Sequence, residues 1–164
     1  MVVTYAHLND LEHWLILAKE VEPLFGPMVE DDGFRSALTD AISNQTALCI
    51  PSVEGSALAG GIVISKDMNE IMWLAVSEAE RGKGYGRQLL EAALRVLDTT
   101  GDIVVQTFDR TVEEGKAARR LYADFGFVDD RDGGLNPAGI PTVLMKRSGA
   151  KPIPTKPSNA RRRR

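Results

Sequence analysis

The chain has 164 residues, of which 43% are hydrophobic and 26% charged, and it carries a formal net charge of −3. This length and composition are typical of one globular domain with a substantial core, and no apolar run approaches the roughly 20 residues of a membrane-spanning helix. Residues 151–164 hold six of the 20 Lys and Arg side chains and none of the 23 acidic ones, so residues 1–150 carry a formal charge of −9. An acidic body of this kind argues against nucleic acid as the main partner and suits a cationic substrate.

The N-terminal segment is predicted to form a short strand at residues 2–5 and then a helix. Asn9 and Asp10 provide an N-cap, and apolar residues recur at helical spacing from Leu11 onward. Pro23 and Pro27 cannot continue a helix, so we expect the helix to end within this segment.

A second helix is predicted to start after Asp31 and Asp32, because apolar residues again recur at helical spacing over residues 34–42. The connection at residues 24–30 mixes bulky apolar side chains with an acid. Two interpretations stay open for it: a lid that packs on its own neighbours, or the wall of a substrate pocket.

After Asn44 the hydrophobic pattern is typical of strands. Strands are predicted at residues 46–50, 57–65 and 70–76, and short turns join them into an antiparallel meander. Gly60 and Gly61 within the second strand indicate a bulge or a close approach by another backbone.

The C-terminal half alternates helices and strands. Expected elements are a helix at 86–97, a strand at 103–107 parallel to the 70–76 strand, a helix at 113–125 that Gly126 ends, and strands at 127–128 and 142–145. The fold class is therefore α+β, with a central mixed, mostly antiparallel sheet flanked by helices. The basic, proline-rich residues 148–164 are predicted to be a disordered tail.

A glycine-rich loop, Arg81-Gly-Lys-Gly-Tyr-Gly86, lies between the 70–76 strand and the following helix. Glycines let a ligand approach the backbone, and a helix N-terminus presents N–H groups to an anion, so the loop is typical of a phosphate cradle. The spacing of a Walker A loop is missing, and Arg87 stands where a dinucleotide fingerprint has its third glycine. Asp109, 23 residues after Gly86, keeps the dinucleotide alternative open, but the antiparallel meander argues against it.

A second motif follows one strand later. Ala118-Arg-Arg-Leu-Tyr122-Ala-Asp-Phe-Gly-Phe127 and the Arg-x-x-Gly-x-Gly loop, in this order, resemble the signatures of the GNAT N-acetyltransferase superfamily, which uses acetyl-CoA. The resemblance covers about residues 1–147 as one domain. It departs from the family at Gly115, where many members have an asparagine that contacts the pantetheine arm.

The resemblance implies roles for particular residues. Glu70 falls where several members have a general base, and Tyr122 where the family keeps its general acid. Period-two alternation would put Glu70 on the same strand face as Met72, Leu74 and Val76. The cofactor-binding residues implied are Leu74, Ala75, Val76, Arg81, Gly82, Lys83, Gly84, Tyr85, Gly86 and Arg87, with the pantetheine arm in a gap between the 70–76 and 103–107 strands.

We therefore predict an N-acetyltransferase that moves the acetyl group of acetyl-CoA to a primary amine by direct attack, with no metal. The acceptor would be a small-molecule or peptide amine, cationic in character, and a homodimer is left open. The alternative is a non-catalytic acyl-CoA-binding sensor or interaction module. Cys49, the only cysteine, excludes an internal disulfide; we expect it to be a packed core thiol, and the chain to be cytoplasmic because it shows no secretory signal.

Overall fold

The computed structural model describes residues 2–53, 55 and 57–149, so nearly all of the predicted basic tail lies outside the described residues. The strands are β1 (Thr4–Tyr5), β2 (Ala47–Pro51), β3 (Leu58–Ser65), β4 (Glu70–Val76), β5 (Ile103–Phe108), β6 (Phe127–Leu135) and β7 (Pro141–Arg147). The helices are α1 (Leu11–Phe25), α2 (Asp32–Ser43), α3 (Tyr85–Val96) and α4 (Lys116–Asp124), with short 3₁₀ turns η1 (Leu8–Asp10), η2 (Glu78–Glu80) and η3 (Glu113–Gly115).

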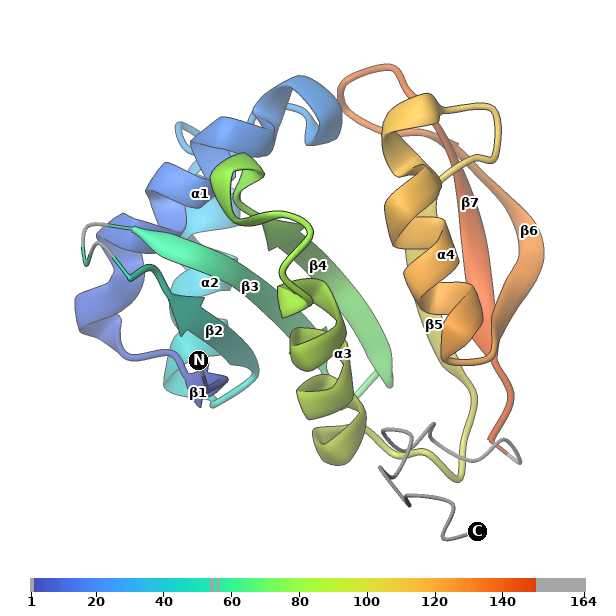
Figure 1. Ribbon diagram of the computed structural model, residues 1–164, viewed down its shortest axis with the longest axis horizontal. Coiled ribbons are helices and arrows are strands. Elements are labelled where there is room, and N and C mark those ends of the chain that lie inside the picture. The colour runs from blue at the N-terminus through green and yellow to red at the C-terminus, as the bar shows by residue number, and fades with distance from the viewer. Residues whose placement is uncertain (1, 54, 56, 150–164) are drawn as a thin grey trace, which may run out of the picture.

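All seven strands belong to one sheet with the order β1-β2-β3-β4-β5-β7-β6. The predicted antiparallel meander β2-β3-β4 is confirmed, and β4 and β5 are parallel neighbours, as expected. Only two residue pairs join β4 to β5, Glu70 with Val104 and Ile71 with Val105. The sheet therefore splits into two arms, β1–β4 and β5–β7, which diverge like the sides of a V (Figure 1).

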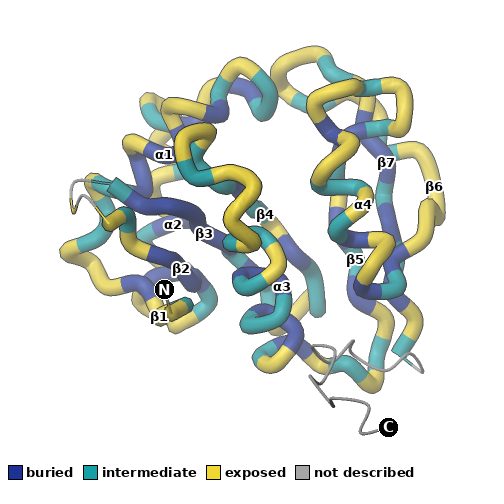
Figure 2. The backbone as a smooth tube through the Cα atoms, viewed as in Figure 1, coloured by how far each residue is buried: buried dark blue, intermediate teal, exposed yellow. Residues whose placement is uncertain are grey.

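Helices cover both faces of the sheet, and the central strands between them are largely buried (Figure 2). The buried side chains form two hydrophobic cores. On one face α3 and α4 bury Leu89, Leu90 and Phe125 against the strands. On the other face α1 and α2 bury Trp14, Leu17 and other apolar side chains. Each helix shows the expected apolar stripe, because residues three and four apart share one face of a helix.

Helix α1 ends within the predicted segment, but it is longer than Pro23 indicated. It passes through Pro23 and ends at Phe25, followed by Gly26 with φ +100°. Pro23 removes only its own hydrogen bond, and the chain stays helical for two further residues. The Gly26 N–H then donates to the Glu22 carbonyl (2.8 Å). Gly26, whose positive φ favours glycine, caps the end of the helix, and Pro27 follows it directly.

Strand β6 is also longer than predicted. The Asp- and Gly-rich residues 129–135 were expected in a loop, but they pair with β7 at the edge of the sheet. Two register shifts, at Asp130 and Gly133, absorb the residues that fit a strand poorly. Because β6 is an exposed edge strand, its polar side chains stay in contact with solvent and lose little hydration free energy.

Gly60 and Gly61 pair regularly with Val76 and Ala75, so no bulge lies at this glycine pair in the pairing with β4. A Cβ on Gly61 would lie 2.5 Å from the Trp14 ring. The close approach that the glycines predicted therefore exists: at Gly61 it is made by the Trp14 indole, and at Gly60 a Cβ would also lie 3.1 Å from the backbone carbonyl oxygen of Ala75.

Candidate active site

The split between β4 and β5 opens into a cleft of about 1020 Å³. The cleft is lined from both arms, by Met72, Trp73 and Leu74 of β4 and by Val105 to Phe108 of β5. Tyr122 of α4 lines it as well, and Phe25, Pro27 and Met28 contribute one wall. The connection after α1 is thus a wall of the pocket, one of the two predicted interpretations.

A β-bulge at Met72 changes the face on which Glu70 lies. Val63 pairs with Trp73, but the next residue, Ile64, pairs with Ile71, so Met72 is left over. Ile71 consequently shares the α3 core with Leu74 and Val76. By alternation Glu70 lies on the opposite face, toward α1 and α2, and the prediction that it shares the face of Leu74 and Val76 is wrong.

Glu70 lies at the closed end of the V, paired with Val104 on one side and Ser65 on the other. Ser65, Lys66 and Asp67 line the cleft, and Glu70 borders this part of it without being among the lining residues. The structure therefore places Glu70 beside the end of the cleft that residues 65–67 line, and Tyr122 among the residues that line the split.

The glycine loop after η2 has an open backbone with two glycines at positive φ. Gly82 and Gly84 have φ of +78° and +83°, and a Cβ on either would meet nothing within 4 Å. The Gln88 N–H donates to the Gly84 carbonyl (3.1 Å) in the first helical hydrogen bond of α3, so the N–H groups before it precede the helical ladder. The loop thus presents open space and backbone donors together.

The loop's cations lie close to acidic partners. Lys83 Nζ lies 2.8 Å from Glu80 Oε2, and Arg87 Nη2 lies 2.9 Å from Asp124 Oδ2 of α4. Arg81 reaches back toward the Val76 carbonyl (3.4 Å) at the end of β4. The pair between α3 and α4 joins the two arms of the V on the face that carries the loop, and Figure 1 shows these two helices flanking the gap.

The other predicted cofactor residues connect the loop to the cleft. Leu74 and Val76 are half-buried and pack toward α3, whereas Ala75 is buried on the opposite face. Tyr85 begins α3 and packs on the core. Among the described residues, the lining of the cleft includes Leu74 but no residue of the glycine loop. The cleft and the glycine loop are therefore two separate sites, which follow one another along β4 and the segment after it.

Tyr122 is 3% exposed and packs edge-on against Phe127 with ring centroids 5.5 Å apart. Burial raises the pKa of its phenol well above the ordinary value of a tyrosine. The hydroxyl therefore stays protonated at neutral pH, and it is a weaker acid than an exposed phenol.

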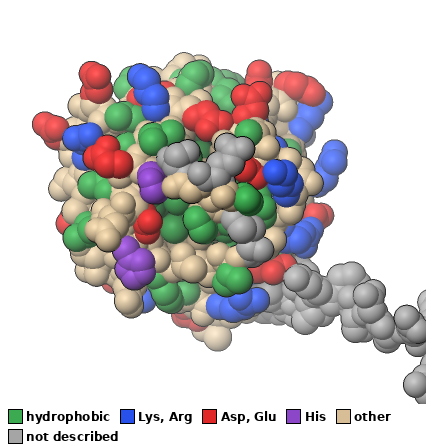
Figure 3. All heavy atoms as spheres, turned by 60° about the vertical axis from the view of Figure 1, so that its left-hand side comes forward, with side chains coloured by type: hydrophobic (Ala, Val, Ile, Leu, Met, Phe, Trp, Pro, Cys, Tyr) green, Lys and Arg blue, Asp and Glu red, His purple; other side chains and the backbone are tan. Residues whose placement is uncertain are grey.

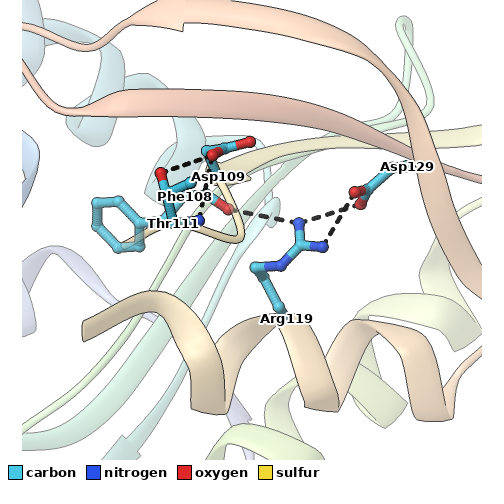
Figure 4. Close-up of polar contacts among 5 residues, drawn as sticks. All are labelled: Phe108, Asp109, Thr111, Arg119 and Asp129. Carbon is cyan, nitrogen blue, oxygen red and sulfur yellow. Dashed lines mark hydrogen bonds and ion pairs between the residues drawn. The ribbon is translucent and has the colours of Figure 1, made fainter. Parts of the chain in front are cut away.

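Arg119 joins α4, the helix that carries Tyr122, to two strands of the sheet (Figure 4). The guanidinium makes two 3.0 Å hydrogen bonds to Asp129 of β6 and one of 3.5 Å to the Phe108 carbonyl of β5. In the same view the Asp109 carboxylate accepts hydrogen bonds from the N–H and hydroxyl of Thr111, which lower its pKa. Asp109, the acid that kept the dinucleotide alternative open, thus stabilises a local turn. The mostly antiparallel sheet also excludes a dinucleotide-binding fold, which needs a parallel sheet.

Other reactive side chains lie away from the cleft. Cys49 is 2% exposed, and burial raises the pKa of its thiol to about 11, which confirms a packed core thiol. The two histidines are surface side chains on the face shown in Figure 3. In the described part of the chain, no cluster of His, Cys, Asp or Glu is suited to hold a metal ion, and no helix is both long and apolar enough to cross a bilayer.

The sequence of residues 19–148 matches the acetyltransferase (GNAT) domain. The chain belongs to the GNAT acetyltransferase family. It is accordingly an acyltransferase, and its seven-strand mixed sheet with flanking helices is the fold of that family. The comparison with curated protein sequences finds no significant match.

Several solved structures share the fold of this acetyltransferase at low sequence identity. The ribosomal-protein-S18-alanine N-acetyltransferase from Escherichia coli superposes with a TM-score of 0.64 at 16% identity, covering 96% of this chain and 97% of that one. A PaiA N-acetyltransferase from Thermoplasma acidophilum, in complex with coenzyme A, has a TM-score of 0.61 at 17% identity and coverages of 89% and 97%. A chimera of the spermidine N-acetyltransferase from Vibrio cholerae and hSSAT has a TM-score of 0.62 at 19% identity, with coverages of 91% and 96%.

The departure of this acetyltransferase at Gly115 has a steric cause. A Cβ on Gly115 would lie 2.4 Å from the Phe108 Cβ. The Phe108 ring therefore occupies the space that an asparagine at this position would need, and it lines the cleft itself.

Three acids line the cleft of this acetyltransferase: Asp31, Asp40 and Asp67. The acidic cluster at residues 30–32 indicated Asp31 from the sequence, whereas sequence reasoning missed Asp40 and Asp67. Asp31 also caps α2 by accepting from the Gly33 N–H (2.8 Å). Lys66 is the one lysine among the lining residues of the described chain. Helical spacing could have indicated Asp40, since it shares a face of α2 with Ala37 and Asn44, but nothing in the sequence shows which face meets the cleft.

Proposed function

We propose that this protein transfers the acetyl group of acetyl-CoA to a primary amine by direct attack. The observation that carries the proposal is the split in the sheet: β4 and β5 stop pairing after Ile71, and the opening is lined by Tyr122. Such an opening can hold an extended thioester arm between two strands, with a buried phenol beside it.

The donor would lie along β4 with its pyrophosphate in the glycine loop. Past Ile71 the edge of β4 that faces β5 has no paired strand in the described chain, so the backbone of residues 74–76 can hydrogen-bond the amides of a pantetheine arm. The N–H groups of residues 82–86 lie just before and at the start of α3, where they favour phosphate, whereas the Arg81 N–H donates to the Glu78 carbonyl (3.3 Å). Coenzyme A in the complex of the Thermoplasma acidophilum relative supports this assignment.

The chemistry needs a neutral amine and a proton for the leaving group. The amine nitrogen attacks the thioester carbonyl, the new C–N bond forms, and the C–S bond breaks as the thiolate leaves. We assign the proton that the thiolate takes up to Tyr122, whose burial keeps it protonated. We assign the proton that the amine loses to Glu70, directly or through a water molecule, since Glu70 borders the cleft on the face toward α1 and α2.

The acceptor would be cationic. Three of the lining residues are acidic and one is a lysine, and the aromatic rings of Phe25, Trp73 and Phe108 form a contiguous surface with centroid separations of 5.8 to 6.0 Å. Aromatic faces and carboxylates both attract an ammonium group. A small polyamine-like molecule or a peptide with a basic residue fits this lining.

An amine panel tests the proposal. Acetyl-CoA is supplied to the wild-type protein with diamines, amino acids, basic peptides and neutral alkylamines, and the release of CoA thiol is measured. We expect transfer, with kcat/KM highest for acceptors that carry a second positive charge, and a loss of this preference as salt screens the cleft. Calorimetric binding of acetyl-CoA with no transfer to any amine would contradict the enzymatic proposal and favour the acyl-CoA-binding module.

A further inference from the structure

The last turns of α1 carry two carboxylates that hold different loops. Glu20 and Glu22 stand on either side of Val21, which is buried against the sheet. Side chains two residues apart on a helix do not face each other. Glu20 and Glu22 therefore reach out to different sides of the helix, and each accepts hydrogen bonds from a separate segment of the chain.

Glu20 fixes the segment that leads into the glycine loop. Its carboxylate accepts a 2.7 Å hydrogen bond from the Glu78 N–H and a 3.1 Å hydrogen bond from the Ser77 hydroxyl. Glu78 opens η2, whose first N–H groups have no partner within the turn itself. Because η2 ends one residue before Arg81, the position of Glu20 determines where the glycine loop begins.

Glu22 fixes the wall of the cleft. Its carboxylate accepts from the Met28 N–H at 2.7 Å and from the Val29 N–H at 3.3 Å. The hydrogen bond from Met28, together with that from the Lys19 side chain, lowers the pKa of Glu22. Met28 and Pro27 line the cleft, while Glu22 itself does not. Glu22 thus acts on the cleft only through the loop that it holds.

The end of α1 also holds the turn between β6 and β7. The carbonyls of the last helical turn lack partners within the helix, and that of Leu24 accepts a 2.8 Å hydrogen bond from Asn136 Nδ2. A Cβ on Gly26 would lie 2.6 Å from the Pro137 Cβ, so this turn packs directly on the helix end. Asn136 and Pro137 line the cleft. Both walls on this side of the cleft are therefore attached to the same helix.

From these contacts we infer that Glu20 and Glu22 are positioning residues through which α1 sets the two substrate sites separately. Glu20 places the loop for acetyl-CoA, and Glu22 places the wall for the acceptor amine. The inference rests on the proposed function, since it takes the glycine loop as the donor site and the cleft as the acceptor site. Neither residue touches a reacting atom.

The variants Glu20→Gln and Glu22→Gln test the inference, because each keeps the length of the side chain and removes its charge. A hydrogen bond to a charged acceptor is stronger than one to a neutral acceptor. We expect Glu20→Gln to raise the KM and the calorimetric Kd of acetyl-CoA about three- to tenfold, with the acceptor KM nearly unchanged. Glu22→Gln should raise the acceptor KM by a similar factor and leave the Kd of acetyl-CoA nearly unchanged. The acceptor used is the amine of the panel that the wild type acetylates fastest.

Glu12→Gln is the matched control, since Glu12 is an exposed carboxylate on the same helix. It should change neither constant. Amide hydrogen exchange supplies a readout that needs no substrate: exchange at Glu78 should become faster only in Glu20→Gln, and exchange at Met28 and Val29 only in Glu22→Gln. Thermal unfolding of each variant checks that the fold is retained.

Two results would overturn the inference while leaving the proposed function standing. One is a pair of variants that shift the same constant together, or shift neither, although the wild type binds and uses acetyl-CoA. The other is faster exchange over all of α1 in both variants, which would indicate general loosening of the helix. A wild type that binds no acetyl-CoA would refute the proposed function instead, and the exchange pattern would still decide whether the two carboxylates hold separate loops.

Discussion

Gly84→Val is the perturbation that separates binding by the glycine loop from stability of the fold. Gly84 has φ +83°, and a Cβ there would meet no neighbour within 4 Å. The substitution therefore causes no clash in the free protein. Its cost is the backbone strain of a β-branched residue at positive φ, about 1–3 kcal/mol. For a domain of this size that corresponds to a melting temperature lowered by about 2–12 °C.

The effect on acetyl-CoA should be much larger. The valine side chain would occupy the open space that the pyrophosphate is proposed to fill, and it would displace phosphate from the loop N–H groups. A hydrogen bond to a charged group contributes about 1.5–3 kcal/mol, so losing two lowers the affinity by roughly 10²- to 10⁴-fold. Calorimetry with acetyl-CoA measures this loss. Acetyl-pantetheine, which has no pyrophosphate, should remain a donor of similar efficiency in wild type and variant.

Gly134→Val is the matched control. Gly134 also has a positive φ (+73°) and open space around it, but it lies on β6 at the far edge of the sheet. It should lower the melting temperature by a similar amount and leave the Kd of acetyl-CoA unchanged. A Gly84→Val protein that binds acetyl-CoA within threefold of wild type would refute the phosphate cradle. Equal losses of affinity in the two variants would show that strain, not the occupied space, is the cause.

Three further predictions follow from the site and the chain. Tyr122→Phe should lower kcat by roughly 10²- to 10⁴-fold with little change in the KM of acetyl-CoA. Glu70→Gln should slow acetyl transfer and flatten the acidic limb of the pH profile of kcat/KM. Steady-state kinetics measured over a range of pH tests both variants, and wild-type rates in both would refute the assigned acid and base. Gly115→Ala places a methyl group against Phe108 and should lower the free energy of unfolding by about 1–3 kcal/mol in a urea titration. An unchanged free energy of unfolding would show that β5 shifts to make room for the methyl group without loss of stability. Deletion of residues 151–164 should leave the melting temperature and acetyl transfer nearly unchanged, because the sequence of this segment has no apolar periodicity. A melting temperature several degrees lower would show that the segment packs on the domain.

Much of the fold could be predicted from the sequence, because its signals are local. β4 has the bounds that the apolar run at residues 70–76 predicted, and α2 begins at the cap that Asp31 indicated. Periodicity and capping depend on side chains a few residues apart, so a single segment carries them. The glycine loop is local in the same sense, since three glycines between a strand and a helix determine a backbone that can bind an anion wherever the segment lies.

The arrangement of the cleft was decided by the tertiary structure. Which residue of β4 is left over at the bulge depends on its pairing with β3, and that pairing moved Glu70 to the face opposite the one that alternation predicted. The acidic lining that includes Asp40 arises only when α2 is packed across the sheet from α4. Register, crossing of helices and the split between β4 and β5 are set by contacts between residues far apart in the chain. The sequence by itself therefore determined most of the elements and the family, and the packing of the two arms decided which side chains line the cleft.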